Sequence, residues 1–177
     1  WLILHAGFGL WRRGQDPGFL RPALPLLLAT VLGAVWLAIA TSAPIWAEVT
    51  IVLMALSAVA AFLVANPAQD RWLLSAPLAM FAGWLTAASS VSTGVLLAGY
   101  GVLSDTASAL VMLGVVLLIA VSVQAKRPTM PVYGATVVWA IIGLITVNWG
   151  QNPTVAYCAT AGALVLTLTT LALLRRR

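Results

Sequence analysis

Residues 104–127 read SDTASALVMLGVVLLIAVSVQAKR, and this stretch decides the class of the fold. Its apolar part, 105–125, is long enough to cross the hydrocarbon core of a bilayer, about 30 Å, as one α-helix. Ser104 offers a capping hydroxyl at the start of that helix, and Asp105 a carboxylate that the helix dipole favours there. The stretch ends with two cations, Lys126 and Arg127. The pattern therefore predicts a membrane-spanning helix that begins and ends at defined residues.

The rest of the chain repeats this pattern. Further apolar runs of spanning length cover residues 22–41, 46–65, 72–98, 131–148 and 153–174. The chain holds 9 Lys and Arg and 4 Asp and Glu in 177 residues, a charged share of 7%, whereas a soluble domain carries about 25%. Apolar residues come in long runs and do not alternate with polar ones, which disfavours a β-barrel. We therefore predict an all-α, polytopic membrane helical bundle.

The first apolar run, 1–11, is about half of the roughly 20 residues that a spanning helix needs. We interpret it as the end of a helix whose start lies upstream of Trp1. The predicted bundle then has about seven transmembrane helices, the first of them truncated.

The cations predict the orientation of the bundle. All nine lie on alternate joints between the runs: Arg12, Arg13, Arg21, Arg71, Lys126, Arg127 and Arg175–Arg177. The remaining joints, 42–45, 99–104 and 149–152, carry no Lys or Arg. By the positive-inside rule the cation-bearing joints and the C-terminus are cytoplasmic, in a multi-pass protein of the inner membrane. Because membrane lipids account for the net charge of +5, we expect no nucleic-acid partner.

The titratable residues argue against most kinds of chemistry. A single His and a single Cys cannot form a structural zinc site, an iron–sulfur site or an internal disulfide. No predicted span contains a buried charged pair, which disfavours an ion-coupled pump. Glu48 and Asp105 are expected near the outer helix ends as interfacial residues. We predict that the protein is not an enzyme and has no catalytic residues.

A few side chains inside the spans are candidates for ligand contacts. For His5, two interpretations stay open: a ligand to the metal of a haem or chlorophyll-type pigment, or a hydrogen bond to a neighbouring helix. Trp36, Trp84 and Trp139 lie too far from the joints to belong to an interfacial belt. Each indole either packs in the core or lines a ligand pocket.

Four segments carry a resemblance to a known family. They are WLILH at 1–5, LGAVW at 32–36, PLAMFAGWLTAA at 77–88 and WAIIGL at 139–144. Together they resemble the TspO, or tryptophan-rich sensory protein, family, and look most like its longer bacterial branch. The resemblance implies a TspO-like helical core in residues 1–98, lacking its first helix, and a three-helix membrane extension in residues 99–177. It also implies a bacterial inner membrane.

The resemblance further implies a ligand site and a kind of function. The ligand-binding residues would be Trp1, His5, Trp36 and Trp84. His5, an imidazole where the family has Tyr, would in addition offer a metal ligand. The ligand or cofactor would be a porphyrin, another tetrapyrrole, a chlorophyll-type pigment or a lipid, bound for sensing or regulation.

The chain departs from the family pattern at three positions and leaves a second function open. His5 stands where the family has Tyr, and Gly33 and Ser92 stand where it has Asn. The lost carboxamides favour a structural accessory subunit of a larger, photosynthetic membrane complex, whereas the internal tryptophans favour the ligand-binding function. We expect a homodimer or membership of such a complex.

Overall fold

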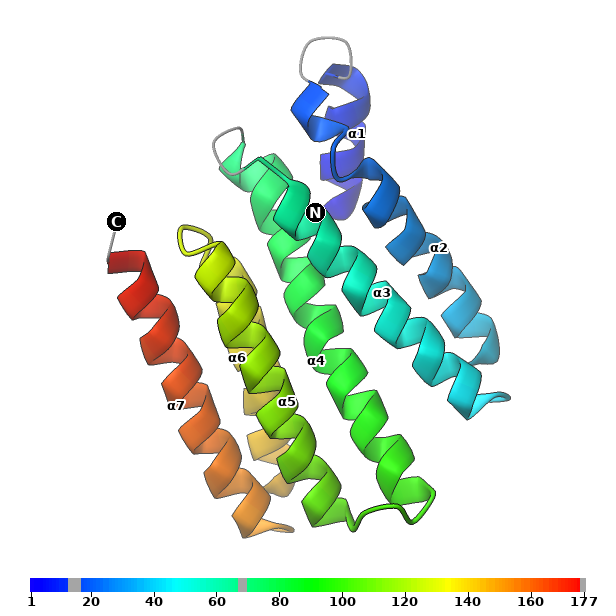
Figure 1. Ribbon diagram of the computed structural model, residues 1–177, viewed down its shortest axis with the longest axis vertical. Helices are drawn as coiled ribbons and strands as arrows, with labels where there is room; N and C mark the ends of the chain where they lie inside the picture. Colours follow the sequence, from blue (N-terminus) through cyan, green and yellow to red (C-terminus); the bar gives the residue numbers. More distant parts are fainter. Residues whose placement is uncertain (13–16, 67–69, 176–177) are drawn as a thin grey trace.

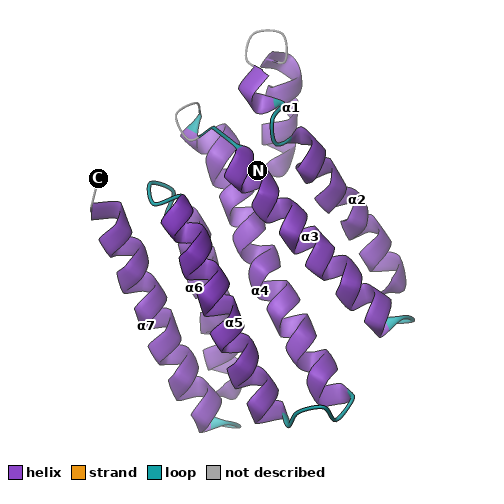
Figure 2. Ribbon diagram, viewed as in Figure 1, coloured by secondary structure: helices purple, strands orange, loops and turns teal. Residues whose placement is uncertain are grey.

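The computed structural model describes residues 1–12, 17–66 and 70–175, and these form helices joined by short loops (Figure 2). The α-helices are α1 (Leu2–Arg12), α2 (Ala23–Ile39), α3 (Pro44–Val64), α4 (Ala76–Gly99), α5 (Asp105–Lys126), α6 (Val132–Asn148) and α7 (Pro153–Arg175). A short 3-10 helix, η1 (Pro17–Phe19), precedes α2, and a π-helical turn, η2 (Arg71–Ser75), leads into α4. The prediction of an all-α membrane helical bundle is confirmed.

The helices differ in length. Four helical stretches are long and apolar enough to cross a membrane: α3, the continuous stretch 71–99, α5 and α7. Helices α2 and α6 have 17 residues each, so each is about 25 Å long. The run predicted to reach residue 41 stops at Ile39, because a turn precedes Pro44 at the first position of α3.

The helix starts follow the sequence signals. The hydroxyl of Ser104 accepts a hydrogen bond from the backbone N–H of Ala107 at 3.2 Å, which confirms the predicted cap of α5. Asp70 caps η2 in the same way, because its Oδ1 accepts from the N–H groups of Trp72 and Leu73 at 3.0 and 2.8 Å. These caps satisfy backbone donors that the first helical turn leaves without partners.

Helix α4 lies at the centre of the bundle (Figure 1). On one side α3 packs against α4, and α2 packs against α3. On the other side α5 and α6 both pack against α4, and α7 packs against α5 and α6. The short α1 contacts η2 and the start of α4. One apolar core runs through both groups, so packing is continuous across residue 98, and the division of the chain there stays a prediction.

The two ends of the bundle differ in charge. The turns between α2 and α3, α4 and α5, and α6 and α7 lie at one end, and their sequences hold no Lys or Arg (Figure 1). The described cations, Arg21, Arg71, Lys126, Arg127 and Arg175, belong to the joints at the other end. We call these the cation-free end and the cation-bearing end. The segregation seen along the sequence is therefore a separation in space.

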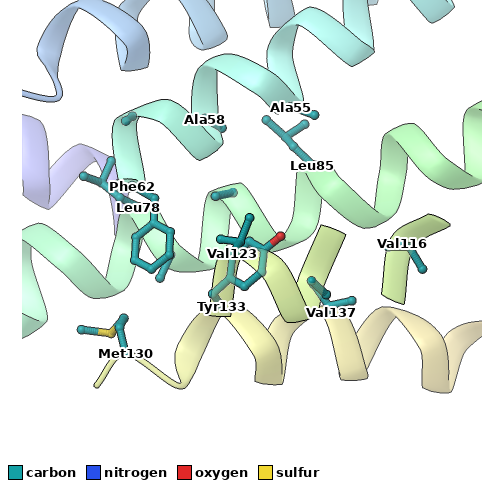
Figure 3. Close-up of a cluster of buried hydrophobic side chains, with 14 of the residues drawn as sticks. Ala55, Ala58, Phe62, Leu78, Leu85, Val116, Val123, Met130, Tyr133 and Val137 are labelled. Carbon is teal, nitrogen blue, oxygen red and sulfur yellow. The ribbon is translucent and has the colours of Figure 1, made fainter. Parts of the chain in front are cut away.

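Close packing of α6 against α3 and α4 involves Tyr133 (Figure 3). Its ring is fully buried and stacks on Phe62 of α3, with ring centroids 5.7 Å apart. Its hydroxyl lies 3.1 Å from Oγ1 of Thr86 on α4. A Cβ atom on Gly83 would lie 2.8 Å from the backbone oxygen of Tyr133, so only glycine permits this approach of α4 to α6. Small residues thus set the helix spacing here.

Candidate functional site

The main cavity lies between α4, α5 and α6. Its volume is about 450 Å³. Helix α4 lines it from Ala87 to Gly99, a rise of about 18 Å from mid-bundle to the cation-free end. The cavity is therefore elongated along the helix axes. Val91 and Val95 line it and are 57% and 69% exposed, so it opens on the outer surface of the bundle.

A few polar side chains stand among the apolar groups of this lining. They are Ser90 on α4, and Asp105 and Ser108 on α5. Ser90 donates to the backbone oxygen of Thr86 at 3.0 Å, which satisfies its own proton. An apolar cavity with a small number of placed polar groups is the usual form of a ligand site, and its volume lies within the common range of about 300–1,000 Å³.

Ser108 has an unusual environment. Its side chain is 2% exposed, and its hydroxyl has no hydrogen-bond partner in the described part of the chain. A buried hydroxyl without a partner costs about 1–3 kcal/mol, so such groups call for an explanation. Asp105 lies three residues earlier on the same helix face, at the exposed first turn of α5. The two side chains mark the cation-free end of the cavity.

A second, smaller hollow of about 300 Å³ lies between α3, α4 and α5. Helix α4 lines it with hydroxyl groups one helical turn apart: Thr86, Ser89, Ser90 and Thr93. At its cation-free end Glu48 of α3 is 9% exposed and accepts hydrogen bonds from Ser92 and Thr93, each at 2.5 Å. Glu48 lies one turn from the start of α3, as predicted. It is, however, a buried link between two helices and not a freely solvated interfacial residue.

The structure gives His5 a hydrogen-bond partner. The ring is 4% exposed, stacks on Phe19, and places Nδ1 at 2.8 Å from the backbone oxygen of Leu73. Because that oxygen can only accept, Nδ1 carries the proton and donates. In an α-helix the backbone oxygen of Leu73 would accept a hydrogen bond from the N–H four residues later. Residue 77 is a proline and has no N–H, so His5 supplies the donor for this oxygen instead.

This arrangement also bears on metal binding. A ring nitrogen that donates to a backbone carbonyl is the usual orientation of a metal-binding histidine, and it leaves Nε2 of His5 as the nitrogen that could hold a metal. The donor type therefore fits the metal of a pigment. The metal-binding role itself stays a prediction.

The four residues predicted to form one ligand site have different surroundings, although Trp1 is close to His5, whose backbone N–H donates to the backbone oxygen of Trp1 at 2.9 Å. Trp1 is 41% exposed and stacks on Trp72, with ring centroids 6.5 Å apart. Trp36 on α2 packs against the core, and its indole N–H has no partner among the described residues. Trp84 is 53% exposed and follows Leu73 by eleven residues, a rise of about 16 Å. Neither described cavity is lined by Trp1, His5, Trp36 or Trp84, so a shared site stays a prediction.

The exposed tryptophans also fit poorly with core packing. Trp139 is 69% exposed, and more than half of Trp84 is exposed as well. Both side chains lie on outer faces of the bundle, which a membrane or a partner would cover. The prediction that Trp84 and Trp139 pack in the core of this chain is therefore wrong.

With the bundle and its cavities described, the chain can be compared with known proteins. A family model described as TSPO-like protein matches residues 1–172, which is almost the whole chain. The chain belongs to this family. Neither a curated protein nor a solved structure matches it.

The match has a consequence for the site. It covers α1 to α6 completely and α7 up to residue 172, so each α-helix of the described chain lies wholly or largely within the TSPO-like region. The cavity between α4, α5 and α6 is thus part of the TSPO-like bundle. It uses α4, which carries the Gly83-Trp84 segment of the resemblance, together with two helices beyond residue 98.

The residues around this cavity were not predicted from the sequence. One signal was available, and it concerns mainly the smaller hollow: the hydroxyl residues of α4 at 86, 89, 90 and 93 recur at intervals of three and four, and only Ser90 of these also lines the larger cavity. Ser108 gave no such signal. Its burial and its missing partner follow from the packing of α4 and α6 around α5.

Proposed function

We propose that this TSPO-like protein binds an apolar ligand in the cavity between α4, α5 and α6, and that it acts in sensing or regulation and not in catalysis. The observation that carries the proposal is the cavity itself, which combines a volume of about 450 Å³ with a mostly apolar lining. Sites between the helices of a bundle are common positions for ligands. The cavity opens where lipid chains would surround the bundle, so an apolar ligand could reach it from the membrane.

The proposal includes an orientation in the membrane. We place the cation-bearing end and the C-terminus in the cytoplasm of a bacterial cell, and the cation-free end on the outer side of the inner membrane. The separation of charge in space supports this orientation (Figure 1). The cavity then lies in the outer half of the protein.

An accessory subunit of a larger membrane complex is the alternative. Its support is the large exposed apolar area, which includes Trp84 and Trp139. A second copy of the chain would cover the same surfaces. Native mass spectrometry of the protein released from membranes distinguishes these cases, because a ligand, a second copy and a large subunit add different masses.

Filling the cavity tests the proposed function. Ala109 lines the cavity on α5, and Ala109→Phe places a ring inside it. Val111 is 50% exposed and does not line the cavity, so Val111→Phe adds bulk to the outer face of the same helix as a matched control. We expect the first variant to lose binding of pyrenebutanol, an apolar fluorescent probe, in nanodiscs, and the control to keep it. Equal binding by both variants would overturn the cavity as the site.

A further inference from the structure

The cavity between α4, α5 and α6 has a charge at one end only. Asp105 is the one charged residue in its lining, and it makes no ion pair among the residues described. Ser108, one turn further into the bundle, holds a hydroxyl without a partner. The Ser108 oxygen is covered by its neighbours, whereas Asp105 is exposed, so Asp105 is the group at this end that a ligand can reach.

The surroundings make this end negative. The sequence of the nearby turn, 100–104, contains no Lys or Arg, and neither do the other turns at the cation-free end. Glu48 adds a second carboxylate at this end, outside the cavity lining. The N-terminal dipole of α5 offsets part of the charge of Asp105, which makes the carboxylate stable there without a cation. A ligand group at this position therefore faces an acceptor-rich, negative environment.

The remainder of the cavity is apolar over a distance that suits an extended molecule. From Gly99 to Ala87 the lining of α4 rises about 18 Å into the bundle. Val91 and Val95 line the cavity where it opens on the outer surface of the bundle, toward the region that lipid would occupy. A molecule that enters there can bury an apolar body and keep its head group beside Asp105.

We infer that the ligand of this cavity is a cationic amphiphile, with an apolar body between α4, α5 and α6 and an amine head that donates to the carboxylate of Asp105. This inference rests on the proposed function, and it names the class of ligand. A neutral alcohol could donate a hydrogen bond to Asp105 but would leave the carboxylate without a counter-charge. A carboxylate head would meet a like charge with no cation beside it, which disfavours anionic amphiphiles.

Three probes with one apolar body test the head group. They are 1-pyrenebutylamine, 1-pyrenebutanol and 1-pyrenebutanoic acid, measured by fluorescence with the full chain in phosphatidylcholine nanodiscs. Empty nanodiscs of the same lipid are subtracted, so that partition into the bilayer does not count as binding. We expect the amine to bind most tightly, then the alcohol, then the acid.

Two variants assign that preference to residues. Asp105→Asn should weaken amine binding about tenfold, as the loss of one charge-assisted hydrogen bond predicts, and should leave the alcohol nearly unchanged. Glu48→Gln is the matched control, since it removes one carboxylate at the same end but outside the lining, and it should keep the amine preference. Circular dichroism checks that each variant stays helical.

The outcomes separate the two proposals. If no probe binds, or if Ala109→Phe binds the probes as the wild type does, the cavity is not the ligand site and both proposals fail. If Ala109→Phe blocks binding but the wild type shows no amine preference, the proposed function stands and the cationic ligand is overturned. Retention of the preference in Asp105→Asn, or its loss in Glu48→Gln, overturns the assignment to Asp105.

Discussion

The guanidinium group of Arg127 donates a hydrogen bond to the backbone oxygen of Ala65 at 2.8 Å, and it also donates to the backbone oxygen of Leu63. Arg127 follows α5, whereas both acceptors lie at the end of α3, 62 and 64 residues earlier in the chain. The last carbonyl groups of a helix have no partner within it, so Arg127 acts as a cap from another part of the chain. Partial burial lowers the pKa of Arg127 below its ordinary value, but a guanidinium keeps its charge at neutral pH.

This contact predicts that Arg127 and its neighbour Lys126 differ in importance. Arg127→Ala leaves two carbonyl groups without a donor, and we expect it to lower the free energy of unfolding by about 1.5–3 kcal/mol. Lys126→Ala removes a cation that is exposed at the end of α5 and should have little effect. Unfolding of both variants in detergent, followed by circular dichroism, measures the difference. If both variants lose the same free energy of unfolding, the hydrogen bonds of Arg127 do not stabilise the fold, and its charge contributes only to the orientation of the protein in the membrane.

The packing of α4 against α6 predicts a strong effect at Gly83. Gly83→Ala places a methyl group 2.8 Å from the backbone oxygen of Tyr133, so the helices must separate, and we expect a loss of about 1–3 kcal/mol in stability. Gly143→Ala is the control, because a Cβ atom there meets nothing within 4 Å. That variant should be neutral or more stable by up to about 1 kcal/mol. Similar melting temperatures of the two variants would contradict this packing.

The hydrogen bond of His5 predicts which substitutions the position tolerates. His5→Phe removes the donor to Leu73 and should cost about 1 kcal/mol. His5→Asn can place its amide N–H near the position of Nδ1, so it should recover much of that loss. Thermal unfolding in detergent compares the three proteins. If His5→Asn is no more stable than His5→Phe, the hydrogen bond contributes little.

The same two variants test metal binding by His5. Both lack Nε2, the nitrogen left for a metal. If Nε2 is a ligand, binding of zinc protoporphyrin should shift its Soret band with the wild type and with neither variant. A shift that His5→Asn retains would show that His5 does not hold the metal.

The separation of charge predicts the side on which the C-terminus lies. We expect a green fluorescent protein fused after Arg177 to fluoresce in the bacterial cytoplasm, and alkaline phosphatase fused there to be inactive. The mirror-image test fuses the reporters into the turn at 100–104, where the activities should be reversed. Active phosphatase at the C-terminus would invert the proposed orientation.

Much of the fold could be predicted from the sequence. Each apolar run is long enough to satisfy its own backbone hydrogen bonds as a helix, and in a bilayer this requirement leaves few alternatives. The helix start at Ser104 depends on neighbouring residues only, so local chemistry places it. The separation of cations follows from the alternation of the joints. All of these properties depend on residues close together in the chain.

The position of the cavity depended on tertiary structure. Helices in a bundle are apolar on nearly every face, so hydrophobic pattern does not say which face meets which neighbour. The packing of neighbouring helices around α5 buries Ser108 without a partner among the described residues, and the packing of α3 against α4 brings Glu48 to Ser92, 44 residues away in the chain. The same packing leaves Trp84 on an outer face, although its place mid-helix suggested an interior role. Sequence determined where most of the helices begin and end, whereas the rotation of each helix decided which side chains face one another.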